Sequence, residues 1–292
     1  MKPNLVYFGS PEFSAEILES IIKNDLVNVV GVVTTPDKPT GRKLTLTPSP
    51  VAVLAGLYDL PIYKPAKLDE ANLAHLRLLK PDIFLVVSFG KIIPQNYLDT
   101  PKIGIYNIHF SLLPKYRGAL CISEAIKNQD SETGVTLMEM DALLDHGPVI
   151  AQSKIAIDIS DNTATLTTKL TQKAIALLAD KLPEICAQKY TKKPQDETAV
   201  VFTPSYKTQT RENAHIPYEK IRIAQSGSDA STLHALIRSL NPDPGAWTKI
   251  NNTDVKLIDT SLVGDKLVLN TVQLSGKSPI SWKQFLQGHQ LD

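Results

Sequence analysis

Short apolar runs alternate with longer stretches of helical spacing from residue 5 to about residue 182. This alternation is typical of helices packed on both faces of a mostly parallel sheet. We therefore expect an α/β domain over this part of the chain. Its strands are predicted at residues 5–8, 27–33, 83–87 and 105–108.

Helical spacing follows the first predicted strand and recurs twice further along the chain. Ser10 can cap the first helix, and Pro11 suits its first turn. Asp69 can cap the second helix. The recurring apolar residues are Phe13, Ile17, Leu18, Ile21 and Ile22 in the first helix, Leu73, Leu76 and Leu79 in the second, and Leu166, Leu170, Ala174, Leu177 and Leu178 in a long third helix.

The turn after the first strand stands where a dinucleotide-binding protein has its glycine-rich phosphate turn. Here the G-x-G-x-x-G spacing is missing, and Pro11 has no N–H to donate, so NAD binding is not expected. Residues 35–50 contain several prolines and two cations, Arg42 and Lys43. The segment is long enough to project as a functional loop, and a solvated surface loop is an equally good interpretation.

The pattern changes after Leu182, because residues 190–197 are polar and charged like a surface linker. We expect one domain over residues 1–186, a linker over 187–203 and a second domain over 204–292. In the second domain, a helix is predicted at residues 231–240. Short β-type runs at 255–258, 266–269 and 271–274, separated by turns, favour a small barrel-like domain.

Composition excludes several classes of protein. The chain has 292 residues, of which 42% are hydrophobic and 21% charged, so a buried core is expected and general disorder is not. The net charge of +1 means that any nucleic-acid binding must use a local basic patch. Two cysteines without metal-ligand spacing argue against a disulfide framework and a zinc site, and a reducing cytoplasm fits best. No apolar run approaches the ~18 residues of a membrane span.

Candidate chemistry lies at the end of the strand predicted around residue 105. Asn107 and His109 are two residues apart and so point to the same side, at the end of the strand where open α/β sheets bind ligands. Asp145 follows in a tight loop between two strand-like segments. An amide donor, an imidazole and a carboxylate can together support acyl transfer to an amine. Each residue alone is ordinary, and a lone histidine at a strand end is more often structural.

A longer motif surrounds these residues. The run Asn107-Ile-His-Phe-Ser-Leu-Leu-Pro114, with Arg117 and Gly118 and then Asp145 and Gly147, closely resembles the folate-dependent formyltransferases. The resemblance implies a Rossmann-like formyltransferase fold, no metal, and Asn107, His109 and Asp145 as the catalytic set. It also implies that 10-formyltetrahydrofolate is the co-substrate. The residues implied to hold it are Phe89, Gly90, Ile92, Ser111, Leu112, Leu113 and Pro114.

Three further stretches, at residues 8–13, 36–51 and 237–247 with 274–277, resemble the family members that formylate methionine on initiator methionyl-tRNA for translation initiation. This implies a monomer whose residues 204–292 form an OB-like barrel that binds tRNA. Arg42, Lys43, Lys192 and Lys193 are the expected tRNA contacts. Formyl transfer to a small amine, such as a nucleotide-linked amino sugar, and a non-catalytic RNA-binding module are the alternatives.

The sequence departs from the family pattern beside the acid. The family usually reads Gly-Leu-Asp-Thr-Gly, whereas this chain has Leu144, Asp145, His146 and Gly147. His146 either tunes the neighbouring carboxylate or faces solvent.

Overall fold

The computed structural model describes residues 2–41 and 43–289. Their contacts divide the chain into two compact units. The first contains the residues up to 117 together with 134–154 and 168–202, and the second contains 118–133, 155–167 and the residues from 203 onward. The second unit thus includes residues 118–133 and 155–167 from the middle of the chain. The boundaries expected from the sequence assign these two segments to the first domain.

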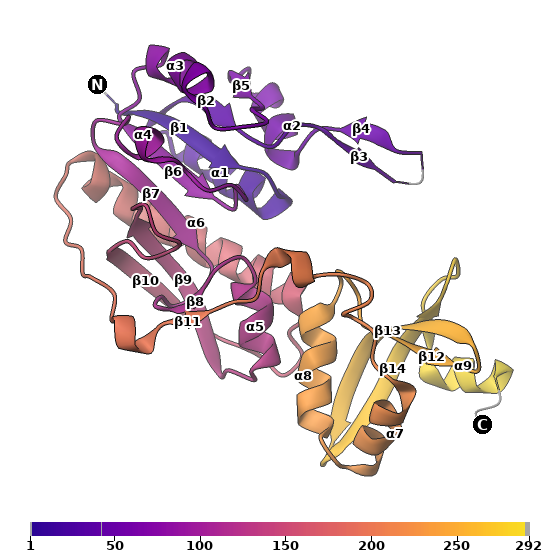
Figure 1. The fold of residues 1–292 in the computed structure, drawn as a ribbon. Coiled ribbons are helices and arrows are strands. Elements are labelled where there is room, and N and C mark those ends of the chain that lie inside the picture. Colours follow the sequence, from indigo (N-terminus) through magenta and orange to yellow (C-terminus); the bar gives the residue numbers. More distant parts are fainter. Residues whose placement is uncertain (1, 42, 290–292) are drawn as a thin grey trace. The chain divides into compact units, whose positions relative to one another are not determined.

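A seven-stranded sheet forms the centre of the first unit, in the order β10-β9-β7-β6-β1-β2-β5 (Figure 1). The pairs β1–β2, β1–β6, β6–β7 and β2–β5 are parallel, and β7 pairs antiparallel with β9. The expected Rossmann-like, mostly parallel sheet is confirmed. Its strands are β1 (Asn4–Gly9), β2 (Asn28–Val33), β5 (Ile62–Tyr63), β6 (Ile83–Val87), β7 (Gly104–His109), β9 (Glu132–Glu139) and β10 (Val149–Ala156).

Helices cover both faces of this sheet because its strands are apolar on both sides. On one face, the Tyr7 hydroxyl of β1 donates to the Ser14 carbonyl of the first helix, at 2.7 Å. On the other face, Phe8 packs in a buried cluster with Leu73 and Tyr97 of the third and fourth helices. The helices are α1 (Glu12–Asn24), α2 (Pro50–Leu57), α3 (Glu70–Leu78), α4 (Gln95–Leu98) and α6 (Thr163–Cys186).

The two predicted helix caps have different outcomes. The Asp69 side chain accepts from the Asn72 amide at 3.0 Å, which confirms it as the cap of α3. The prediction for Ser10 is wrong, since α1 begins after Pro11 without a side-chain cap. The Ser10 hydroxyl instead accepts from the Thr35 amide at 3.3 Å, and so ties the first turn to the segment after β2.

Residues 35–50 form an ordered hairpin. Its strands β3 (Lys38–Thr40) and β4 (Thr45–Thr47) pair antiparallel, and all their residues are exposed. Ser49 then caps α2 by accepting from the Ala52 amide at 3.1 Å. A second small pair, β8 (Lys115–Arg117) with β11 (Val201–Phe202), is parallel.

A four-stranded antiparallel sheet forms the second unit, in the open order β12-β13-β14-β15. The expected small β domain is present, although no pairing of β15 with β12 that would close a barrel is seen among the described residues. Residues 266–269 and 271–274 are one strand, not two runs separated by a turn, and the irregularity lies opposite, near Asp259. The strands are β12 (Trp247–Ile250), β13 (Thr253–Val263), β14 (Lys266–Leu274) and β15 (Ile280–Ser281).

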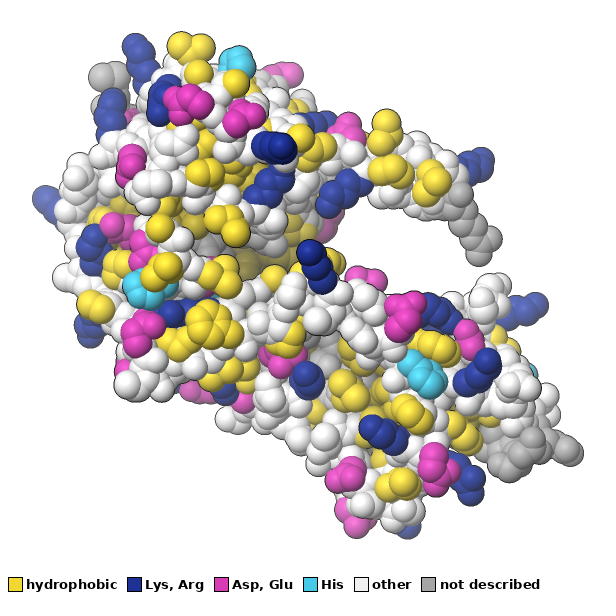
Figure 2. Space-filling view, viewed as in Figure 1, with side chains coloured by type: hydrophobic (Ala, Val, Ile, Leu, Met, Phe, Trp, Pro, Cys, Tyr) yellow, Lys and Arg dark blue, Asp and Glu magenta, His cyan; other side chains and the backbone are white. Residues whose placement is uncertain are grey.

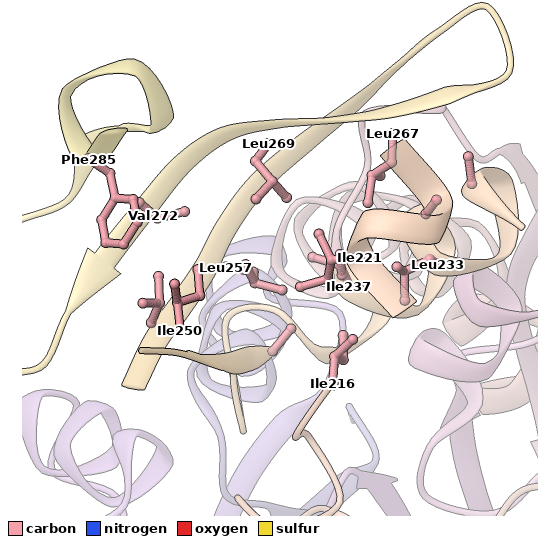
Figure 3. Packing of buried hydrophobic residues seen from close by; sticks show 14 residues of the cluster. Ile216, Ile221, Leu233, Ile237, Ile250, Leu257, Leu267, Leu269, Val272 and Phe285 are labelled. Atoms are coloured by element: carbon pink, nitrogen blue, oxygen red, sulfur yellow. The ribbon is translucent and has the colours of Figure 1, made fainter. Parts of the chain in front are cut away.

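Helices pack on this sheet around a core of their own. Figure 3 shows Ile221 and Ile237 of the helices beside Leu257 of β13, and all three are buried. Phe285 of the last helix is 1% exposed in the same cluster. The helices are α5 (Cys121–Lys127), α7 (Tyr218–Ser226), α8 (Ala230–Leu240) and α9 (Trp282–Gly288), with short 3-10 turns at Glu197–Ala199 and Tyr206–Thr208 along the chain. Among the described helices, none has both the length and the apolar character to cross a membrane.

Candidate active site

Strand β7 carries two polar side chains into the interior at its C-terminal end. Asn107 and His109 are 8% and 5% exposed, and they pair in register with Met138 and Thr136 of β9. Buried amide and imidazole groups need polar partners. Their common side on the strand, predicted from the two-residue spacing, directs both toward the loop between β9 and β10.

Asp145 in that loop is the shared partner. Its carboxylate oxygens lie 3.6 Å from Nδ1 of His109 and 3.5 Å from Nδ2 of Asn107. The structure therefore brings the three expected catalytic residues together, which the sequence alone does not establish. The backbone of Asp145 is left-handed, with a φ of 46°, a conformation that costs a non-glycine residue about 1–2 kcal/mol. Strain of this kind recurs at functional sites.

The loop leaves no room for a side chain at Gly147. A Cβ there would lie 1.8 Å from the Glu139 carbonyl oxygen, which belongs to the backbone of β9. The glycine therefore lets the loop close tightly against the end of β9, and this closure helps to set the position of Asp145.

His109 is held from its other side as well. Nε2 lies 2.8 Å from the Tyr116 carbonyl oxygen. A carbonyl can only accept, so Nε2 must carry a proton and donate it. That leaves Nδ1 facing Asp145, with the ring orientation fixed.

Polar side chains of β9 and β10 brace the turn after β7. The Thr136 hydroxyl donates to the Ser111 carbonyl at 2.6 Å and accepts from the Leu113 amide at 3.1 Å. Gln152 donates both to the Leu113 carbonyl at 2.8 Å and to the Thr136 hydroxyl at 2.9 Å. The turn expected to contact folate is thus fixed by the protein before any ligand binds.

The remaining residues expected at the folate site differ in exposure. Phe89 is 2% exposed and packs edge-on against Phe8 at a centroid distance of 5.5 Å, so its ring belongs to the core. Gly90 is exposed and has a φ of 77°, and Ile92 is 87% exposed. A large aliphatic side chain this exposed is available to an apolar ligand surface.

The residues expected to contact tRNA lie in two places. Arg42 is outside the described residues, whereas Lys43 is exposed near the tip of the β3–β4 hairpin, which also exposes Leu44 and Leu46. Figure 2 shows hydrophobic and basic side chains on the surface of this hairpin. Lys192 pairs with Glu139 at 2.8 Å, and this hydrogen bond raises the pKa of Lys192 above its ordinary value. Lys193 forms a pair of backbone hydrogen bonds with Val149.

His146 lies beside two further carboxylates. Its Nδ1 lies 2.5 Å from a carboxylate oxygen of Asp141, and its Nε2 lies 3.6 Å from one of Glu197. The side chain is 36% exposed, so it is only partly solvated.

Comparison with known proteins identifies the family of this chain. Residues 2–182 match the family described as Formyl transferase, and residues 216–267 match Formyl transferase, C-terminal domain. The chain belongs to the formyl transferase family. Methionyl-tRNA formyltransferase of Staphylococcus aureus (strain JH1) is 38% identical over 260 residues, which cover 89% of this chain and 79% of that protein. The enzyme of the same name from Staphylococcus epidermidis is 36% identical over 263 residues, covering 90% and 81%.

Solved structures of other formyl transferases share the fold. The N-formyltransferase from Helicobacter canadensis, in complex with folinic acid and dTDP-3-aminofucose, has a TM-score of 0.65 at 22% identity, covering 94% of this chain and 96% of that one. A 4-N formyltransferase from Francisella tularensis has a TM-score of 0.67 at 18% identity, covering 88% and 97%.

This formyl transferase has further polar residues at the site that sequence reasoning missed. Gln195 and Glu197 lie in the segment expected to be a surface linker, and both hydrogen bond to Arg117. Gln195 also hydrogen bonds to the loop that contains Asp145. Arg117 stands in the family motif, but nothing in the sequence indicates its partners. Gln195 lies 50 residues beyond Asp145, in a polar stretch without periodicity.

Proposed function

We propose that the protein transfers the formyl group of 10-formyltetrahydrofolate to the α-amino group of methionine on initiator methionyl-tRNA. The observation that carries the proposal is the convergence of Asn107, His109 and Asp145 in a chain 38% identical to a methionyl-tRNA formyltransferase. The folinic acid bound to the Helicobacter canadensis relative supports a folate donor.

The three side chains have complementary roles in this reaction. The Asn107 amide donates to the formyl oxygen as negative charge develops on it, assisted by the His109 ring. The uncharged amine of methionine forms the new C–N bond, and the bond from the formyl carbon to the folate nitrogen breaks. Asp145 keeps His109 oriented and accepts the proton that the amine loses, which then passes to the departing folate nitrogen.

Substrate binding uses the surfaces around this centre. The turn Ser111–Pro114, together with Gly90 and Ile92, holds the folate. The buried ring of Phe89 supports the neighbouring residues Gly90 and Ile92 from the core. Lys43 on the hairpin, together with the charge of Arg42, attracts the acceptor end of the tRNA. Residues 204–292 and Lys193 supply further phosphate contacts, and Lys192 joins them by exchanging Glu139 for a phosphate. The enzyme acts as a cytoplasmic monomer.

The test is to incubate the protein with charged initiator tRNA and 10-formyltetrahydrofolate and to assay for blocked methionine amino groups. We expect rapid formylation of the charged tRNA and none of free methionine. A nucleotide-linked amino sugar is the control for the alternative substrate class. Formylation of the amino sugar without formylation of the charged tRNA would reject the proposal in favour of a small-molecule enzyme.

A further inference from the structure

The amide of Gln195 joins both sides of the catalytic loop. Its Nε2 donates to the Asp145 carbonyl and to the Gly147 carbonyl, each at 2.8 Å. These two bonds use both N–H groups of the amide. They cross the loop on either side of residue 146, so one side chain fixes the backbone at the residue that carries the carboxylate.

A buried arginine fixes the amide in turn. The Oε1 of Gln195 accepts from Nε of Arg117 at 3.1 Å and from its Nη2 at 2.9 Å. Arg117 is 3% exposed, and a guanidinium can only donate. The oxygen of the amide must therefore face Arg117 and its nitrogen must face the loop, which leaves a single allowed orientation.

Glu197 completes the arrangement by holding the arginine. Its carboxylate accepts from Nη1 and Nη2 of Arg117 at 3.1 and 2.6 Å, in the two-pronged geometry that arginine favours. The guanidinium is thereby oriented from two sides, and its charge is compensated where it is buried.

We propose that Gln195, anchored by Arg117, is a positioning residue that sets Asp145 against His109 and Asn107. Asp145 is in a left-handed conformation, which is sparsely populated for residues other than glycine. The two hydrogen bonds from Gln195 hold the carbonyls of Asp145 and Gly147 and so stabilise this conformation of the loop. Displacements near 1 Å at a catalytic group typically cost about 10²-fold in rate, so losing these bonds slows the chemical step.

This inference rests on the proposed function and is tested with the same formylation assay on the full chain. Gln195→Ala removes all four hydrogen bonds of the amide. Gln195→Glu keeps the shape and the pairing with Arg117 but cannot donate to the two carbonyls, so it separates the effect on the loop from the effect on folding. Thr198→Ala is the matched control, because that hydroxyl lies on the same exposed segment and donates only to Asp196.

We expect both Gln195 variants to lower kcat by about 10- to 100-fold, with KM for 10-formyltetrahydrofolate within about twofold of wild type. Thr198→Ala should match wild type, and Gln195→Glu should remain folded at the temperature of the assay. Wild-type kcat in Gln195→Glu, or a loss confined to KM, would overturn the inference. An inactive wild-type protein would instead reject the proposed function.

Discussion

The carboxylate of Asp145 is 3.6 Å from Nδ1 of His109 and 3.5 Å from Nδ2 of Asn107, distances longer than those of strong hydrogen bonds. Catalytic groups without substrate are often separated in this way and approach one another when the reacting atoms lie between them. The Asn107 amide is thus placed to exchange part of its contact with Asp145 for the formyl oxygen.

The first prediction concerns Asn107. Replacing it with alanine removes a donor aimed at the developing charge, and we expect kcat to fall about 10²- to 10³-fold with an unchanged unfolding temperature. Asn96→Ala is the control, since that amide bonds to Glu70 on the surface. Steady-state formylation kinetics measure the effect, and near-wild-type turnover in Asn107→Ala would remove the residue from the proposed mechanism.

The sequence predicts part of this site for a clear physical reason. Two-residue spacing at a strand end places Asn107 and His109 together, and strand geometry makes that inference local. The proximity of Asp145 to these two residues depends on how a loop that is distant in the sequence folds. Its prediction therefore rests on family resemblance and not on spacing. Gln195 has neither signal, because a single amide in a polar segment acquires its role only through contacts that folding creates.

Strands and helices act on the site mainly through the turn after β7. Thr136 of β9 and Gln152 of β10 hold the backbone of Ser111 and Leu113 with three hydrogen bonds, and a fourth joins the two side chains to each other. From the sequence, β9 and β10 were expected only as two strand-like segments on either side of the Asp145 loop, without residue bounds. The strand at residues 83–87 could be predicted because a continuous apolar run is typical of a strand buried on both faces of the sheet, and the strand at 105–108 shares this character except at Asn107. Single-residue irregularities, such as that near Asp259, leave no mark in the apolar pattern.

The second prediction tests that brace. Thr136→Val keeps the shape but removes the hydroxyl, and an unpaired buried group left behind costs about 1–3 kcal/mol in unfolding free energy. We expect KM for 10-formyltetrahydrofolate to rise about tenfold, the factor that 1.4 kcal/mol represents. Thr133→Val on the same strand is the control, because the buried Thr133 hydroxyl has no hydrogen-bond partner within the described part of the chain. Equal effects of the two substitutions would contradict the brace.

The third prediction concerns a buried histidine of α8. His234 is 2% exposed, with Nδ1 2.7 Å from the Thr260 hydroxyl and Nε2 3.1 Å from the Ile159 carbonyl. Burial lowers its pKa below the ordinary value of 6.5, so the unfolded chain binds a proton more readily than the folded one. This histidine therefore destabilises the fold progressively as the pH falls below 6.5 toward the lower folded-state pKa.

Urea unfolding between pH 7.5 and pH 5 measures this effect. His234→Gln should reduce the loss of unfolding free energy on acidification, because glutamine does not titrate. His75→Gln, at an exposed position on α3, is the control and should leave the pH dependence unchanged. An identical pH dependence in His234→Gln and wild type would show that another group is responsible.

Across the whole molecule, the net charge of +1 provides no general attraction for RNA. Attraction must come from local cations. The pairing of Lys192 with Glu139 reduces the electrostatic attraction that Lys192 exerts on RNA before binding. Lys43 is exposed on the hairpin, and the residues that follow it, 44–47, include no acid.

The fourth prediction follows from this distribution. Binding of initiator tRNA should weaken between 50 and 200 mM salt by about 15- to 250-fold, with a log–log slope near −2 to −4 set by the few phosphates contacted. Lys43→Ala should make the slope shallower by about 1. Fluorescence titration at several salt concentrations measures both, and an affinity that does not change with salt would argue against RNA as the substrate.

The most direct test of the central claim is a double-mutant cycle on His109 and Asp145, read by single-turnover formylation of methionyl-tRNA. Each alanine substitution alone should lower the rate about 10²- to 10⁴-fold, and the double variant should be no slower than the worse single variant within a few-fold, because the two side chains act as one unit. Losses that multiply in the double variant, or single variants close to wild type, would contradict the account.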